Sequence, residues 1–366
     1  MSETRVLWLT PDKPANISVG RRRIAAHLEG RGFEVVLRGT TATTLVRSLR
    51  DREGFDAVIG TTRAGAIAGA VVSMVQECPL IVDHVDPISQ LERTASRPIA
   101  TTVRWLENTA FTLAAHVLYV YPEEAPRVSR FTASSTKTDL GVDFDRFANP
   151  SSDAIRAAET RLEGMDLGDR TAIYLGGLEP IYHLQELLGS VENLEDWTLV
   201  IVGDGSLSGL VHRAATRSEG IEFLGSVAHE AVPGYLHVAD VGVCLVNDPH
   251  TLKVLEYGAA DLPVVQLRGR AEERFGGLVE FCSTDPADIA RAIEAAYDRS
   301  EGVDRTAEAG RAERPNRTNR DERTTRDVRG GRSETKEVSE SLRAFARRYD
   351  WAEIATDYES VLDEVL

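Results

Sequence analysis

The sequence predicts an α/β protein made of two consecutive domains, each a parallel sheet covered by helices on both faces. Short apolar runs, which indicate buried strands, alternate with helix-like stretches along most of the 366 residues. This alternation pauses once, in the polar and turn-rich residues 136–153, and then starts again. A chain of this length can fill two hydrophobic cores. We therefore place a first domain at residues 1–150 and a second at residues 151–345.

The first domain begins with a strand and then alternates helices and strands. Its expected strands are residues 5–10, 34–39, 57–61, 79–86 and 116–121. Its expected helices are residues 21–32, 62–77 and 103–115. A loop that ends at Gly20 is expected before the first helix, and Gly32 closes that helix.

The second domain repeats the pattern. Its expected strands, separated by helices, are residues 171–177, 197–205, 221–226, 241–247 and 262–267. Residues 300–338 have almost no apolar side chains and mix both signs of charge, so we expect a loose or partly disordered insert. A basic interaction tail is the alternative, but the interspersed acids disfavour it. Residues 346–366 return to helical spacing, with an apolar side formed by Trp351, Ile354, Tyr358, Val361 and Leu362.

The composition limits the possible partners and the compartment. The net charge is −16 and only four of the basic residues are lysines, which indicates either a halophilic source or a GC-rich genome. Such an acidic chain lacks the basic face of a nucleic-acid binder. Cys78, Cys244 and Cys282 have no metal-site spacing and predict reduced thiols. No signal peptide precedes the first strand, and the apolar run at residues 64–75 is shorter than the about 20 residues that span a bilayer. We therefore expect a cytoplasmic protein.

Residues 247–266 predict a strand end, a helix, a turn and a strand. Asp248 is expected to cap a helix whose first residue is Pro249 and which ends near Ala260. Glu256 then lies at the rim of the apolar side of this helix, and Lys253 lies farther round. One interpretation is a surface ion pair worth tenths of a kcal/mol. The other is a ligand site at a helix N-terminus beside the carboxyl edge of a sheet.

Glycine-containing turns follow two other strands of the same domain. Gly203, Asp204 and Gly205 come directly after the strand at 197–205, and Gly176 and Gly177 end the strand at 171–177. Glycine lets a backbone approach a ligand closely, although a tight turn requires it too. Three strand ends with such loops in one domain favour the ligand site.

At this point the sequence resembles the family 4 glycosyltransferases of the GT-B fold. The segments that carry the resemblance are, in order, RGFEV, DLGVDFDRF, YLGGLEP, LVIVGDGSL, IEFLGSVAHEAVPGYLHVADVGVCLV, DPHTLKVLEYGAADLPVV and YDWAEIATDYESVL. It implies two Rossmann-like domains that face each other across a cleft. The first domain would bind the acceptor, the second the nucleotide sugar, and the helix at 346–366 would pack back on the first. The implied reaction transfers a sugar from a nucleotide diphosphate sugar with retention of configuration, without a cofactor and without a metal ion.

The resemblance also implies roles for individual residues. Glu256 would hold the ribose hydroxyls, Lys253 would lie near the diphosphate, and Asp248, in place of the usual Glu, would face the transferred sugar. Asp86 would face the reaction centre from the first domain, with His84 as a neighbour that is satisfied by other contacts. The other implied donor-binding positions are Gly20, Gly176, Gly177, Gly203, Asp204, Gly205, Ser226 and Val227.

One departure from the family bears on activity. Gly177 and Tyr182 stand where the family has an Arg and a Lys that hold the diphosphate. Either other groups compensate, namely Lys253, His183 or the arginines around Arg21, or the protein is a nucleotide-sugar-binding or scaffold subunit with impaired catalysis. A sugar-nucleotide epimerase is a third possibility. By family habit the acceptor is a lipid-linked glycan, for example on polyprenyl phosphate, which would place the protein peripherally at the inner membrane face.

Overall fold

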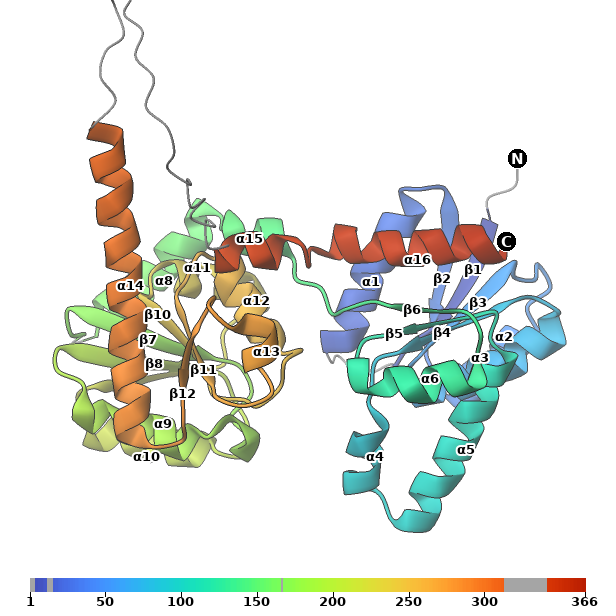
Figure 1. Ribbon diagram of the computed structural model, residues 1–366, viewed down its shortest axis with the longest axis horizontal. Coiled ribbons are helices and arrows are strands. Elements are labelled where there is room, and N and C mark those ends of the chain that lie inside the picture. Colours follow the sequence, from blue (N-terminus) through green and yellow to red (C-terminus); the bar gives the residue numbers. More distant parts are fainter. Residues whose placement is uncertain (1–3, 12–15, 166, 313–340) are drawn as a thin grey trace, which may run out of the picture. The chain divides into compact units, whose positions relative to one another are not determined.

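The computed structural model describes residues 4–11, 16–165, 167–312 and 341–366 (Figure 1). The chain forms two compact units, one of Met1–Phe144 with Ala346–Leu366 and one of Asp145–Phe345. The division after residue 144 comes slightly earlier than the boundary we placed at residue 150. Each unit is a six-stranded parallel sheet with helices on both faces, so the predicted GT-B type of α/β fold is confirmed.

The first sheet has the strand order β2-β1-β3-β4-β5-β6. Its strands are β1 Thr4–Leu9, β2 Phe33–Arg38, β3 Ala57–Thr61, β4 Leu80–His84, β5 His116–Tyr119 and β6 Ser135–Lys137. Its helices are α1 Asn16–Glu29, α2 Ala42–Leu49, α3 Thr62–Gln76, α4 Ile88–Thr94, α5 Arg97–Leu113, η1 Pro122–Glu124, α6 Ala125–Phe131 and α16 Trp351–Val365. The five expected strands are present, and β6 is an additional edge strand.

The two faces of this sheet bury different cores. Val6 and Trp8 of β1 pack with α1 and with Tyr358 of α16, whereas Leu7 and Leu9 face the helices on the other side. The alternation follows from the two-residue period of a strand. The helix α3 lies very near the strands, because a Cβ on Gly65 would be 2.7 Å from the Leu9 carbonyl oxygen.

The second sheet has the strand order β12-β11-β10-β7-β8-β9. Its strands are β7 Arg170–Leu175, β8 Trp197–Val202, β9 Ile221–Gly225, β10 Val241–Cys244, β11 Val264–Leu267 and β12 Glu280–Cys282. Its α-helices, some of which adjoin the division between the units, are α7 Phe144–Ala148, α8 Ser152–Glu163, α9 Leu184–Ser190, α10 Ser208–Arg217, α11 Val232–His237, α12 Leu252–Ala259, α13 Glu272–Phe275, α14 Pro286–Ala312 and α15 Leu342–Arg347. Short 3-10 turns are η2 Pro180–Tyr182, η3 Val191–Asn193 and η4 His229–Ala231.

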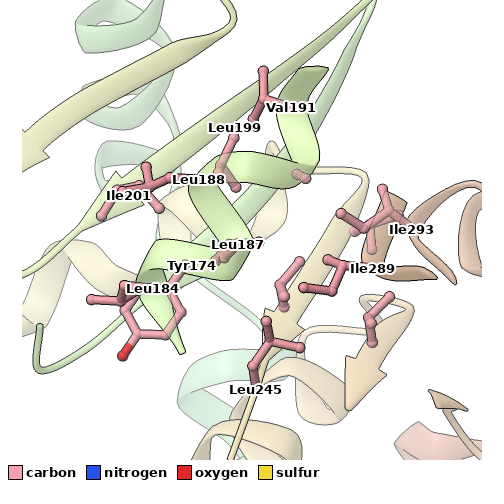
Figure 2. Packing of buried hydrophobic residues seen from close by; sticks show 14 of the residues in the cluster. Tyr174, Leu184, Leu187, Leu188, Val191, Leu199, Ile201, Leu245, Ile289 and Ile293 are labelled. Atoms are coloured by element: carbon pink, nitrogen blue, oxygen red, sulfur yellow. The ribbon is translucent and has the colours of Figure 1, made fainter. Parts of the chain in front are cut away.

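The core of the second unit lies between this sheet and the helices α9 and α14. Figure 2 shows Leu184 and Leu187 of α9, Leu199 of β8, and Ile289 and Ile293 of α14 in one apolar cluster. This cluster fixes β7 and β8 against the helices that follow them, and therefore fixes the turns at their carboxyl ends.

The expectation of a loose insert at residues 300–338 was wrong for the first part of that segment. The helix α14 continues to Ala312, so residues 300–312 are helical and not a loose loop. Ala, Glu and Arg, which have high helix propensity, make up seven of the thirteen residues 300–312. Residues 313–340 lie outside the described residues. Within the described part of the chain, no helix combines the length and the apolar character needed to cross a membrane.

Candidate active site

The carboxyl ends of β7 and β10 form the point where the strand order of the second sheet reverses. The two strands are parallel neighbours, and the chain continues from β7 to β8 on one side and from β10 to β11 on the other. In open α/β sheets, ligands bind outside the carboxyl ends of the strands at such a reversal. The turn after β7 and the segment before α12 both lie at this point.

Backbone hydrogen bonds join the glycine turns at this edge. The Gly176 amide donates to Val202 O at 2.9 Å, and the Gly203 amide donates to Gly225 O at 2.9 Å. Gly203 has φ +144°, and a Cβ there would clash with the Gly176 carbonyl. A Cβ on Gly205 would lie 2.6 Å from Leu178 O. Contact between neighbouring turns therefore already explains Gly203 and Gly205.

The other predicted donor-binding positions at this edge are Asp204, Ser226 and Val227, of which Asp204 and Ser226 are exposed. The Asp204 carboxylate accepts hydrogen bonds from the Gly205 amide at 2.8 Å and from the Ser208 hydroxyl at 2.6 Å, and these bonds lower its pKa. Asp204 thus closes its own turn. Ser226 and Val227 follow β9, which is two strands away from β7.

The helix α12 begins later than predicted, and the cap assignment of Asp248 is wrong. The N-cap residue is Thr251 and the first helical residue is Leu252. Asp248 instead accepts a hydrogen bond from the His250 amide at 2.9 Å, which closes the turn before the helix. The reason is tertiary: the His250 side chain is buried, and its Nδ1 lies 2.6 Å from Nη1 of Arg274.

Glu256 and Lys253 lie on α12, but they do not form the surface ion pair that was one interpretation. Among the described residues, neither side chain makes an ion pair or a hydrogen bond. Glu256 is half-buried, and burial raises its pKa to about 7 although the charges of Lys253 and Arg146 oppose the increase. An acid and an ammonium that form no ion pair or hydrogen bond at the reversal point of a sheet are groups that a ligand can bind.

The Lys253 side chain lies over the turn that follows β7. Its Nζ is 4.0 Å from the centre of the Tyr182 ring and 5.8 Å from that of Tyr174. A Cβ on Gly176 would lie 2.8 Å from Nζ, so glycine at this position makes room for the lysine. Gly177 has more space, since the nearest atom to a Cβ there is 3.9 Å away on Tyr182.

In the first unit, Asp86 lies two residues beyond β4 and is partly exposed. Nη1 of Arg63 is 3.7 Å from the Asp86 carboxylate, and Nη2 donates to the carbonyl oxygens of Asp86 at 3.0 Å and Pro87 at 2.6 Å. Burial raises the pKa of Asp86, against the charges of Arg63 and His84. Arg63 therefore fixes the segment that carries Asp86.

His84 is buried between two carboxylates. Its Nδ1 lies 3.2 Å from Glu107 Oε1 and its Nε2 lies 3.0 Å from Glu124 Oε2. Arg127 contacts both glutamates, at 2.6 Å and 3.0 Å. Glu124 also accepts a hydrogen bond from the Ile88 amide at 2.9 Å, so this network holds the start of α4.

The sequence analysis did not identify Arg63, Glu107, Glu124 or Arg127. For Glu107 a signal was available, because it lies at helical spacing between Val103 and Ala110 on the inner side of α5. A charged residue on an apolar face implies a buried partner. The identity of that partner requires the fold.

Two expectations about the start of α1 are corrected. Gly20 lies inside the helix, not in the loop before it, and a Cβ there would clash with the ring of Trp351. Arg21 is completely buried and donates to the Asp83 carboxylate at 2.6 and 2.7 Å and to Tyr358 OH at 2.9 Å. Packing and a buried ion pair therefore account for both residues. His183, the other residue considered as a compensating group, lies 3.8 Å from Glu186.

No cluster of three or more His, Cys, Asp and Glu side chains that could hold a metal ion is found in the described ranges. The three cysteines are free, and Cys244 and Cys282 are buried.

Residues 169–299 match the family model described as Glycosyl transferases group 1. The matched segment contains the second sheet and α12, and with it Lys253 and Glu256. It covers about a third of the 366 residues. No curated protein matches the sequence.

Solved structures show the same fold along the whole chain. HepE from Anabaena, in complex with UDP, has a TM-score of 0.70 at 14% identity, covering 99% of this chain and 100% of that one. Sucrose-phosphate synthase from Thermosynechococcus elongatus has a TM-score of 0.70 at 14% identity, with 99% and 98% covered. A glycosyltransferase from Rickettsia africae has a TM-score of 0.68 at 12% identity, with 100% and 99% covered. The GT-B fold and the group 1 match together support a glycosyltransferase.

Proposed function

We propose that this protein is a retaining, family 4-type glycosyltransferase that moves a sugar from a nucleoside diphosphate sugar to an acceptor. The observation that supports this most is the pair of groups on α12. Among the described residues, the Glu256 carboxylate and the Lys253 ammonium form no ion pair and no hydrogen bond. They lie where the strand order of the second sheet reverses, inside the segment that matches the group 1 family model.

In the proposed donor complex, Glu256 accepts hydrogen bonds from the two ribose hydroxyls. A carboxylate suits this role because it accepts two hydrogen bonds at once. Lys253 contacts the diphosphate and stabilises the charge that develops when the bond between the sugar carbon and the phosphate oxygen breaks. Asp248 faces the transferred sugar, and the turns at Gly177 and Ser226 contact the nucleotide through their backbone.

The proposed reaction needs no strong general base. As the bond to the diphosphate breaks, the acceptor oxygen bonds to the same sugar carbon, and its proton passes to the leaving phosphate. The chemistry requires no cofactor and no metal ion from the protein, because the Lys253 ammonium supplies positive charge at the leaving group. The acceptor binds the first unit, where Asp86 contacts it.

The nature of the substrates is the finer part of the proposal. The titles of the HepE structures name UDP, UDP-glucose and glucose, so UDP-glucose is the first donor to test. The proposed acceptor is a polyprenyl-phosphate-linked glycan used for a surface glycoprotein or polysaccharide. The protein would then work in the cytoplasm, in peripheral contact with the inner face of the membrane.

Turnover of defined substrates tests the proposal. The protein is incubated in high salt with UDP- and GDP-sugars and polyprenyl phosphates, and products are read by mass spectrometry. We expect a product whose mass is increased by one sugar, and a loss of about 100-fold in rate for Glu256→Ala. Glu294→Ala, an exposed acid on α14, is the matched control and should transfer at the wild-type rate. Equal rates for both variants would exclude this site.

A second function is favoured by one specific observation. Gly177 and Tyr182 stand at the two positions where the resembled family has cations. A subunit that binds nucleotide sugars without turnover fits this loss. Tight UDP binding together with no product from any donor would support it, and conversion of the donor without an acceptor would instead indicate an epimerase.

A further inference from the structure

The ammonium of Lys253 is located by aromatic rings. Its Nζ is 4.0 Å from the centre of the Tyr182 ring and 5.8 Å from that of Tyr174, both within the range of a cation–π interaction. No carboxylate forms an ion pair with it in the described part of the chain. The rings therefore place the charge without neutralising it.

The two rings are fixed by the fold. Tyr174 belongs to β7, is completely buried, and donates its hydroxyl hydrogen to Gly177 O at 2.6 Å. Tyr182 is the last residue of η2. The centre of its ring lies 6.0 Å from the centre of the Tyr174 ring, at an interplanar angle of 58°. Tyr174 thus connects the strand, the glycine turn and the second ring.

The opposite side of the lysine chain rests on backbone. Its Cε and Nζ occupy the space that a Cβ on Gly176 would fill, as Gly176 has φ +141°. An unbranched lysine side chain normally loses about 2 kcal/mol of rotamer entropy when it is fixed. A site that fixes it before the ligand arrives lowers that penalty on binding.

We propose that Tyr182, supported by Tyr174, is a positioning residue that holds the Lys253 ammonium at the diphosphate. Tyr182 stands at a position where the resembled family has a cation, and its ring orients the ammonium of Lys253, which comes from a different element, α12. This inference rests on the proposed function for its ligand, a nucleoside diphosphate. The face of the ring does the positioning, so the phenol hydroxyl is dispensable.

The position of the lysine can be measured without any nucleotide. The sequence contains four lysines, Lys13, Lys137, Lys253 and Lys336, so protein labelled with 13C at lysine Cε gives a simple spectrum. Lys253→Arg assigns the Lys253 signal. We expect the Hε protons of Lys253 to lie upfield of their position in urea, because they face an aromatic ring. The upfield shift should persist in Tyr182→Phe and disappear in Tyr182→Leu, which fills space without a ring.

Nucleotide affinity then tests the consequence. By calorimetry we expect Tyr182→Leu to weaken UDP binding about tenfold and UMP binding by less than about twofold, while Tyr182→Phe stays near the wild type. Tyr297→Leu is the matched control, since Tyr297 also lies under a cation in this unit, with Arg170 5.2 Å away at the start of β7. It should change neither the lysine signal nor the UDP affinity.

The outcomes separate this inference from the proposed function. The inference is overturned, whatever the protein binds, if the Lys253 signal of the wild type is not shifted upfield. It is also overturned if the upfield shift persists in Tyr182→Leu. UDP binding that is unchanged in Tyr182→Leu also overturns it, while the proposed function stands. If the wild type binds neither UDP nor GDP, the proposed function fails, and so does the assignment of the ligand.

Discussion

At the carboxyl edge of the first sheet, the buried charges are paired with one another, whereas at the edge of the second sheet an acid and an ammonium form no ion pair or hydrogen bond. Arg21 binds Asp83 with both side chains completely buried, and His84 lies between Glu107 and Glu124. Lys253 and Glu256 have no such contacts within the described residues. Paired charges hold a fold together, whereas unpaired charges near a surface remain available to a ligand.

The largest effect is expected from breaking a pair in the first unit. In Asp83→Asn the Arg21 charge stays buried without compensation, so the free energy of unfolding should fall by about 3–5 kcal/mol. Urea denaturation followed by circular dichroism measures it. The double variant Arg21→Met with Asp83→Leu should recover most of the loss. A decrease below about 1 kcal/mol in Asp83→Asn would remove the contrast between the two edges.

The same chemical change in the second unit should give the opposite result. Glu256→Gln removes no ion pair or hydrogen bond and avoids the cost of burying an ionised carboxylate, so at pH 8 its free energy of unfolding should equal or exceed that of the wild type. UDP affinity should fall by about tenfold or more, because a hydrogen bond to a charged acceptor becomes one to a neutral acceptor. Calorimetry and urea denaturation of one preparation give both numbers. A large loss of stability with unchanged affinity would assign Glu256 to the fold.

The paired charges at the carboxyl edge of the first sheet should also make the stability of the protein depend on pH. Burial lowers the pKa of His84, but hydrogen bonds and charges from Glu107 and Glu124 raise it more, so the pKa is raised overall. A raised folded-state pKa gives stability that is complete below about pH 6.5, the unfolded value, and is lost as pH rises through the folded value. The loss should be about 1.4 kcal/mol per unit of pKa difference. Unfolding of the wild type and of His84→Asn at several pH values measures it, and parallel curves would contradict it.

The smallest expected effect is the pH dependence of nucleotide binding at the unpaired edge. Burial raises the pKa of Glu256 to about 7, so the ionised form is in the minority below that value. Because the carboxylate accepts more hydrogen bonds than the neutral acid, UDP affinity should rise about threefold from pH 6 to pH 8. Glu256→Gln is the control, because any pH dependence of UDP affinity that remains in it comes from other groups, such as UDP itself. An equal rise in UDP affinity in that variant would exclude Glu256 as the cause.

Local patterns in the sequence predicted most of the fold. Five strands in each unit were predicted, because an apolar run between turn residues is a local signal. The strands that were missed, Ser135–Lys137 and Glu280–Cys282, are three-residue edge strands, too short to give a periodic signal. Residues 300–312 were expected to be irregular because charge was weighed above helix propensity.

The candidate site was only partly predictable, for a physical reason. Helical periodicity places Glu256 and Lys253 on one helix, and apolar runs place the glycine turns at strand ends. The contact of Lys253 with Tyr182, and the network of His84 with Glu107 and Glu124, join residues far apart in the chain. No local rule gives such pairs. The start of α12 was missed as well, and the contact of the buried His250 with Arg274 next to it also joins residues far apart in the chain.

The position of Trp351 bears on the order in which the chain can fold during synthesis. Its ring lies against both Gly20 and Gly141, and the helix that it begins supplies Ile354 and Tyr358 to the first core. A ribosome makes these residues only after the whole of residues 145–345 has been translated. The first unit therefore waits, incomplete, while the second unit, which is continuous in the chain, can fold as it emerges.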